Sequence, residues 1–187
     1  MERQREQALI RLAKRGDAQA FAELYRAHVD SIYRYIYYRV NTVTTAEDLT
    51  ADVFMKALEG LAAYQDRATP FLAWLYRIAH ARLVDHYRRS RHDDGHEDID
   101  AIELGADHDL DAALMAAHQS DHMQTALRTL TDEQQQVILL RFVEGHSVEK
   151  TAELLGKTEG AIKAMQHRAL QALGRALERQ GFRPQED

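Results

Sequence analysis

The sequence predicts an all-α protein of two small helical domains joined by an acidic, flexible linker. A length of 187 residues suits one or two small domains. Apolar residues recur every three or four positions in several long segments, which is the spacing that lines one face of a helix. Alternation typical of strands is scarce, and the only prolines, Pro70 and Pro184, lie far enough apart for long helices to form.

The charge of the chain is distributed unevenly, and this predicts the domain boundaries. Residues 93–111 hold nine Asp and Glu and no Lys or Arg, whereas residues 1–92 hold 15 Lys and Arg against 11 Asp and Glu. A glycine-containing acidic segment without apolar periodicity is typical of a solvated linker. We therefore expect one domain over residues 1–92, a linker over 93–117 and a second domain over 118–187. Surfaces on either side of the linker can be locally basic despite the net charge of −6.

The first domain is expected to be a bundle of three or four helices. Asp17 is a candidate N-cap for the first long helix, and the apolar residues on its inner face are Phe21, Leu24, Tyr25, Val29, Ile32, Ile36 and Val40. A second helix is expected to begin after Thr44 and Thr45. Its inner face would carry Leu49, Val53, Phe54, Ala57, Leu58 and Leu61.

A third helix, over residues 71–89, combines an apolar face with many cations. Its inward residues would be Phe71, Leu75, Ile78, Ala79 and Leu83. From Arg77 to Arg91 the chain has five arginines and one acid, Asp85, close to Trp74, Tyr76 and Tyr87. Arginines can neutralise phosphates, and aromatic rings can stack on exposed bases. The alternative is that Trp74 belongs to the core and the arginines form a solvated face.

The second domain begins with a predicted helix near Met115 to Leu127, a break at residues 130–134 and an apolar run over 137–142 that ends before Gly145. The segment that follows has the spacing of a helix-turn-helix. This motif needs a small residue where the helices cross, a turn residue tolerant of positive φ and a branched apolar anchor. These requirements are met by Ala152, Gly156 and Ile162, with Leu155 and Met165 as further core residues.

Thr158 is a candidate N-cap for the second helix of this motif. That helix would direct Glu159, Gly160, Lys163, Ala164 and His167 towards a major groove and place Arg168 near a phosphate. An ordinary helical hairpin is the alternative interpretation of the same spacing.

Other function classes find less support. The absence of cysteine excludes disulfide scaffolds, thiolate zinc sites and cysteine nucleophiles. His118 and His122 share a helix face, but no HExxH motif accompanies them, so a metal-dependent hydrolase is a weak alternative. We expect no catalytic residues, metal or cofactor. No apolar run has the roughly 18 to 20 residues of a membrane span, and the first residues lack the apolar stretch of a signal peptide, which predicts a cytoplasmic protein without membrane insertion.

Three segments, residues 46–54, 71–89 and 130–170, resemble in order the two domains of extracytoplasmic-function sigma factors of bacterial RNA polymerase. The resemblance covers nearly the whole chain outside the linker and the last few residues. It implies a non-enzymatic subunit that directs polymerase core to promoters, with a region 2 domain that recognises and melts the −10 element and a region 4 domain that binds the −35 element. A stand-alone repressor would leave the first domain unexplained.

The resemblance also implies roles for individual residues. Those expected in the helix that grips the β′ clamp helices of polymerase are Asp48, Leu49, Asp52 and Phe54. Those expected to bind the −10 DNA, as duplex and melted strand, are Gln65, Asp66, Arg67, Trp74, Arg77, Ala81, Arg82, Arg88 and Arg89. Those expected to bind the −35 element are Thr158, Glu159, Gly160, Lys163, Ala164, His167 and Arg168.

Further partners implied by the resemblance are the β flap of polymerase and an anti-sigma factor. The linker resembles the family connector that runs through the polymerase channels, where its acids could mimic nucleic acid, although composition alone fits a flexible tether equally. Four positions depart from the family pattern: Ala51 and Asp52 replace a Gln-Glu pair, Ala81 replaces an asparagine and Met165 replaces an arginine. The last two affect base reading, so no promoter sequence is carried over.

Overall fold

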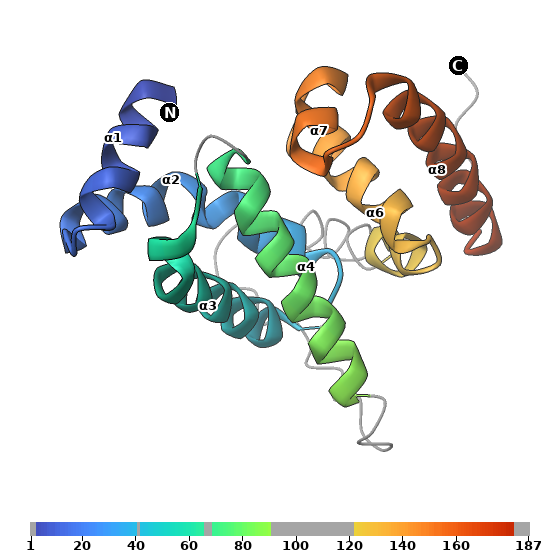
Figure 1. Cartoon of the computed structure of the whole chain (residues 1–187). Helices are drawn as coiled ribbons and strands as arrows, with labels where there is room; N and C mark the ends of the chain where they lie inside the picture. The colour runs from blue at the N-terminus through green and yellow to red at the C-terminus, as the bar shows by residue number, and fades with distance from the viewer. Residues whose placement is uncertain (1–2, 41, 66–68, 91–121, 182–187) are drawn as a thin grey trace, which may run out of the picture. The chain divides into compact units, whose positions relative to one another are not determined.

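The computed structural model describes residues 3–40, 42–65, 69–90 and 122–181. All regular structure in these ranges is helical, without a strand, as predicted. The chain divides into two compact units (Figure 1). The predicted linker over 93–117, with both of its boundaries, lies outside the described residues.

The described residues of the first unit form four α-helices and one short 3-10 helix. They are α1 (Arg3–Ala13), α2 (Ala18–Tyr37), α3 (Val43–Gly60), η1 (Leu61–Ala63) and α4 (Phe71–Ser90). Helix α2 packs against α1, α3 and α4, and α3 packs against α4. The predicted bundle of three or four helices is therefore present.

Capping side chains fix where the helices of this unit begin. Asp17 caps α2, as predicted, because its Oδ1 accepts hydrogen bonds from the backbone N–H groups of Gln19 and Ala20 at 2.9 and 3.0 Å. Helix α3 begins at Val43, earlier than predicted. The reason is that Thr42 is its N-cap, with Oγ1 accepting from the backbone N–H of Thr45 at 3.0 Å.

The core of the first unit lies between the inner faces of α2, α3 and α4. Its fully buried residues include Leu24, Ile32, Ile36, Val53 and Leu75. Two predicted inner residues are outside it: Leu58 is 54% exposed and Tyr25 is 41% exposed. Leu58 follows Ala57 by one helical step, so when Ala57 points inward Leu58 is rotated by about 100° towards solvent.

The second unit contains a helical segment over 122–128, then α6 (Asp132–Ile138), the π-helix η2 (Leu139–Val143), α7 (Val148–Leu155) and α8 (Glu159–Arg179). The start of the helix predicted near Met115 lies outside the described residues. Thr131 and Gln134 form a reciprocal capping box at the predicted break, which starts α6. Helices α6 and α7 both pack on α8 (Figure 1).

Candidate functional site

Helices α7 and α8 form the predicted helix-turn-helix. Ser147 caps α7 by accepting from the backbone N–H of Lys150 at 3.0 Å. Gly156 ends α7 in the left-handed region at φ 64°, a conformation that costs glycine little because it has no Cβ. Thr158 then caps α8, as predicted, with Oγ1 accepting from the backbone N–H of Ala161 at 3.2 Å. The turn chemistry therefore confirms the interpretation of residues 152–162.

An apolar cluster holds the two helices of the motif together. Ala152, Ile162 and Met165 are buried against Val137 of α6, and Val148 and Leu155 pack against this cluster. The apolar residues that the sequence assigned to the core of the motif are therefore packed together, as predicted. A third helix, α6, covers their far side.

The N-terminal half of α8 presents one exposed polar face. Ile162, Met165 and Ala169 point into the core, which leaves the opposite side of the helix to solvent. All seven predicted −35 residues are exposed, namely Thr158, Glu159, Gly160, Lys163, Ala164, His167 and Arg168. Apart from its chain neighbours and the nearby backbone of α8, nothing lies within 4 Å of where a Cβ of residue 160 would be, so the start of this face is open.

The contacts within this face are weak enough to exchange for a ligand. Lys163 lies 3.8 Å from Glu159, and both side chains are more than half exposed. His167 and Gln171 are 3.1 Å apart between ring and amide nitrogens. Exposed ion pairs contribute about 0 to 1 kcal/mol. Lys163 can therefore turn from Glu159 to a phosphate at small cost.

Arg141 of the π-helix is hydrogen-bonded both to α8 and to the segment before α7. Its Nε donates to Oε1 of Gln166 at 2.9 Å, and its guanidinium also donates to the carbonyl of His146. Lys157, in the turn, forms an ion pair with Glu133 of α6 at 2.9 Å. These contacts join η2 to α8 and α6 to the turn before α8, so they fix the direction in which α8 points.

His146 lies at the junction between η2 and α7. Its Nε2 is buried and has no hydrogen-bond partner among the described residues. Burial lowers the pKa of His146 below 6.5; Lys150 lowers it further, whereas Glu144 raises it. The imidazole is therefore favoured in its neutral form.

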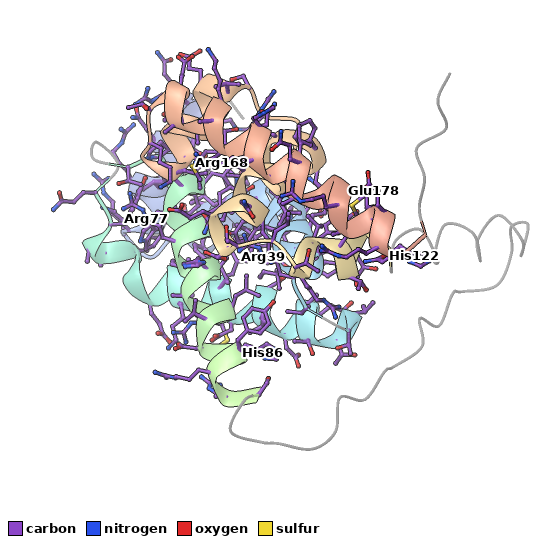
Figure 2. The ribbon with its side chains drawn as sticks, turned by 90° about the vertical axis from the view of Figure 1, so that its right-hand side faces the viewer. Arg39, Arg77, His86, His122, Arg168 and Glu178 are labelled. Atoms are coloured by element: carbon purple, nitrogen blue, oxygen red, sulfur yellow. The ribbon has the colours of Figure 1, made fainter. Side chains whose placement is uncertain are left out.

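The arginines of α4 do not form one uniform set. Arg77, Arg88 and Arg89 are exposed, and so is Ala81, whereas Arg82 is half-buried. Figure 2 shows Arg77 pointing away from its helix. The exposed cations lie along one helix of the first unit, which can follow a phosphate backbone.

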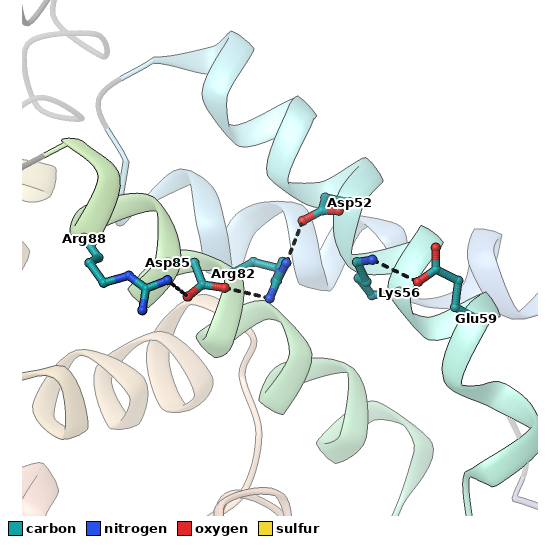
Figure 3. A network of polar contacts seen from close by, with 6 residues as sticks. All are labelled: Asp52, Lys56, Glu59, Arg82, Asp85 and Arg88. Carbon is teal, nitrogen blue, oxygen red and sulfur yellow. Dashed lines mark hydrogen bonds and ion pairs between the residues drawn. The ribbon is translucent and has the colours of Figure 1, made fainter. Parts of the chain in front are cut away.

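Arg82 connects the predicted −10 surface to the predicted polymerase surface. Its guanidinium pairs with Asp85 at 2.7 Å and with Asp52 of α3 at 3.5 Å, while Arg88 pairs with Asp85 at 3.3 Å (Figure 3). The sequence predicted different partners for these two residues, polymerase for Asp52 and −10 DNA for Arg82. The structure brings the two side chains together, so a change at either one affects both helices.

Trp74 lies at the edge of the core rather than fully inside it. Its ring is half-buried, with its centroid 4.6 Å from that of Tyr64 and 5.6 Å from that of Phe71. Gln65, which follows Tyr64 in the chain, is exposed. Asp66 and Arg67 lie outside the described residues. One part of the indole thus packs in the core, while the remainder is exposed to solvent.

The four predicted polymerase contacts on α3 differ in exposure. Asp48 is exposed, Leu49 and Asp52 are half-buried, and Phe54 is buried with its ring edge-on to Tyr25 at 4.8 Å. The Phe54 side chain therefore packs in the core and is not exposed for contact with a partner.

Sequence reasoning missed two exposed apolar residues on the same helix. Met55 is 62% exposed and Leu58 is 54% exposed. With Asp48 they recur at spacings of seven and three residues, which places them along one side of α3. The signal that could have found Met55 is an apolar residue outside the inner stripe of an amphipathic helix.

The histidines offer no metal centre in the described part of the chain. His122 Nδ1 is 3.0 Å from Oε1 of Gln180, beside the C-terminal end of α8, near Glu178 in Figure 2. His118 lies outside the described residues. Within residues 3–40, 42–65, 69–90 and 122–181, no three His, Cys, Asp or Glu side chains gather as metal ligands would. Nor does any described helix have the length and apolar character to cross a bilayer.

Both units match known sequence families. Residues 24–92 match the family described as Sigma-70 region 2, and residues 121–173 match that described as Sigma-70, region 4. The ECF RNA polymerase sigma factor BldN of Streptomyces coelicolor is 38% identical over 172 residues, which are 90% of this chain and 64% of BldN. The ECF RNA polymerase sigma factor SigD of Mycobacterium tuberculosis is 33% identical over 92% of this chain and 84% of SigD.

Solved structures share the fold. The structure of CnrH in complex with the cytosolic domain of CnrY aligns over 93% of this chain and 97% of the matched chain, with a TM-score of 0.70 and 22% identity. At that identity the likeness concerns the fold alone. It agrees with the helical architecture described for the two units.

Proposed function

The chain belongs to the extracytoplasmic-function sigma factors of RNA polymerase, and we propose that it directs polymerase core to specific promoters as a non-enzymatic subunit. The observation that carries this proposal is the exposed polar face of α8 on a complete helix-turn-helix. A family match gives the class of protein, whereas this face supplies a surface able to enter a major groove. The chain spans 64% of the length of BldN, so its activity and its partners are proposals.

We assign −35 recognition to the second domain, residues 118–187. The seven exposed residues from Thr158 to Arg168 lie on the first three turns of α8, the part of a recognition helix that meets base edges. Lys163 and Arg168 would neutralise phosphates and fix register, while His167 and the small residues Gly160 and Ala164 allow close approach to the bases.

We assign −10 recognition and melting to the first domain, residues 1–92. Arg77, Arg88 and Arg89 offer exposed cations along α4, and the half-buried indole of Trp74 offers a stacking surface at its start. Stacking of an extruded base contributes about 1 to 3 kcal/mol, which offsets an unstacking cost of a few kcal/mol. Melting can therefore be selective without any covalent step. Gln65, Asp66, Arg67, Ala81 and Arg82 complete the set that we assign to this DNA.

We assign polymerase binding to the exposed side of α3. Asp48 offers a charge there, with Met55 and Leu58 as apolar neighbours, while Leu49, Asp52 and Phe54 hold the helix in place. A side that combines apolar area with acid suits a partner surface with a basic rim. The β′ clamp helices are the partner that the family resemblance gives for this helix. The β flap is the partner that it gives for the second domain, and an anti-sigma factor would act by covering either surface.

The acidic stretch within residues 93–117 would connect the two domains in this scheme. Its nine acids give it the charge of a nucleic-acid mimic inside a basic channel. The place of action would be the cytoplasm, where polymerase and promoter DNA meet.

The experiment that tests this function compares DNA binding with and without polymerase core. A promoter fragment is selected from a randomised library by core plus the chain, and its affinity is then measured for the chain alone and for the assembled holoenzyme. We expect weak binding by the chain alone and tight, sequence-dependent binding after core is added. Tight and specific binding by the chain alone, unchanged by core, would instead identify a stand-alone repressor.

A further inference from the structure

Lys14, immediately after α1, contacts the residue that precedes the loop before α4. Its Nζ donates a hydrogen bond to the backbone carbonyl of Tyr64 and lies 5.6 Å from the centroid of the Tyr64 ring. One ammonium group thus holds Tyr64 by its main chain and by its ring. Lys14 and the whole of α1 precede residue 24, where the match to Sigma-70 region 2 begins. The family match therefore does not include them.

Tyr64 in turn contacts Thr69, five residues further along the chain. Its side chain is only 6% exposed, and its hydroxyl donates to the carbonyl of Thr69 at 2.5 Å. The two described ends of the loop, at Tyr64 and Thr69, are therefore tied to each other. Because Lys14 holds Tyr64, α1 is coupled to both ends.

Tyr64 also determines where Trp74 lies. The two rings are 4.6 Å apart between centroids, with an angle of 30° between their planes. On another side, the indole approaches Gly60 so closely that a Cβ there would lie 3.3 Å from Cζ2 of Trp74. The indole is thus confined between Tyr64 and the end of α3, and its exposed part has one defined direction.

From these contacts we propose that Lys14 is a positioning residue for melted −10 DNA, acting through Tyr64 on the indole of Trp74. This inference rests on the proposed function, because it assumes that Trp74 stacks on an unpaired base. Lys14 itself need not touch DNA. Its contribution is to hold the stacking surface in the orientation that a base requires, so that less ordering is needed at the moment of melting.

The chain provides a direct reporter for this coupling, since Trp74 is its only tryptophan. Lys14→Met removes both contacts to Tyr64 while keeping a similar side-chain length, and Lys14→Arg retains a cationic donor. Arg5→Met is the matched control, because it removes a cation of α1 that pairs with Glu23 on the exposed surface at 2.8 Å. Gly60→Ala displaces the indole from the other side without touching Lys14.

The first measurement is quenching of Trp74 fluorescence by acrylamide in the full chain, with helix content followed by circular dichroism. We expect greater quenching for Lys14→Met and Gly60→Ala, and values near those of the original chain for Lys14→Arg and Arg5→Met. Unchanged quenching in Lys14→Met would overturn the proposed coupling between Lys14 and Trp74. This result does not depend on the proposed function.

The second measurement is binding by assembled holoenzyme to two probes: a single-stranded −10 oligonucleotide and a −35 duplex, both from a promoter selected by the original holoenzyme. We expect Lys14→Met to bind the oligonucleotide roughly tenfold more weakly, as loss of one charge-assisted hydrogen bond would allow. Binding of the duplex and of core should stay unchanged, and Lys14→Arg should restore most of the loss. Equal weakening towards both probes and core would mean that Lys14 only stabilises the fold, and would reject the proposal.

The two proposals can fail separately. If the original holoenzyme does not bind the −10 oligonucleotide at all, the assigned function of the first domain fails. If it binds and Lys14→Met binds equally well, the assigned function stands and the role of Lys14 is rejected.

Discussion

Arg141 and Gln166 are joined by a 2.9 Å hydrogen bond from Nε to Oε1, which links the π-helix η2 to α8. The same guanidinium donates to the carbonyl of His146, just before α7. One side chain therefore fixes both helices of the motif relative to η2. Neither residue is assigned a DNA contact in the proposed scheme. A substitution in this pair therefore tests how the motif is held together without removing a proposed DNA contact.

Arg141→Met should lower the stability of the second unit and weaken binding to the −35 element. Removing hydrogen bonds made by a charged donor is expected to cost about 1 to 3 kcal/mol in the free energy of unfolding. Urea unfolding of the full chain and anisotropy with a −35 duplex measure the two effects. Lys150→Met is the control, because the exposed pair of Lys150 with Glu153 should contribute less than about 1 kcal/mol. Equal effects of the two substitutions would contradict the supporting role of Arg141.

Replacing Lys163 and Arg168 by alanine should flatten the salt dependence of promoter binding. Each lost phosphate contact lowers the slope of log affinity against log salt by about one. Holoenzyme affinity measured between roughly 50 and 200 mM salt gives this slope. Arg128→Ala, which removes an exposed cation from the helical segment over 122–128, should leave the slope unchanged. If the double variant kept the original slope, its two cations would not contact phosphates.

Asp48→Lys should weaken binding to polymerase core without unfolding the first unit. Asp48 is exposed on α3, so the substitution places a like charge against a basic partner without burying it. We choose Asp48 rather than Asp52, because Asp52 pairs with Arg82 at 3.5 Å and its loss would also disturb α4. Titration of labelled core with each chain measures affinity. Asp30→Lys makes the same charge change on the exposed surface of α2 and should bind as the original does; if both variants bound equally, α3 would not be the gripping helix.

The second unit should lose stability as the pH falls below about 6.5, because of His146. Burial keeps the native pKa of His146 below 6.5, so the unfolded chain takes up a proton at higher pH than the native chain does. Stability therefore rises with pH between the native and the unfolded pKa, and acidification through that window favours unfolding. Urea unfolding at about pH 7.5 and about pH 5.5 should show a smaller loss for His146→Gln than for the original chain.

His86, at the C-terminal end of α4 (Figure 2), has a pKa lowered mainly by burial and also by Arg89. It therefore adds pH dependence of the same sign to the first unit. His86 is present in both chains of the comparison, so its contribution cancels. An identical pH dependence in the His146→Gln variant would contradict the assignment to His146.

Much of the fold was predictable because local chemistry dictates it. Gly156 meets the need for a left-handed turn, Thr158 and Asp17 cap helices that follow them, and Ile162 sits where the motif requires a branched anchor. These requirements depend on neighbours a few positions away in the chain. They are therefore visible as spacing in the sequence.

What the sequence could not reveal are contacts between elements. The pair Asp52 and Arg82 spans 30 positions, and the contact of Lys14 with Tyr64 spans 50. Neither follows from a helical period, because the period gives the face of a residue but not its opposite partner. Leu58 is a different case: the helical period already turns it away from Ala57, so its assignment to the core was wrong.

The most direct test of the central claim is in vitro transcription with purified polymerase core on a randomised promoter library, with and without this chain. The account predicts that transcripts with defined start sites appear only when the chain is present. It also predicts that they are lost from templates whose −10 or −35 elements are replaced. Failure of the chain to join core, or to start transcripts from any template, would contradict it.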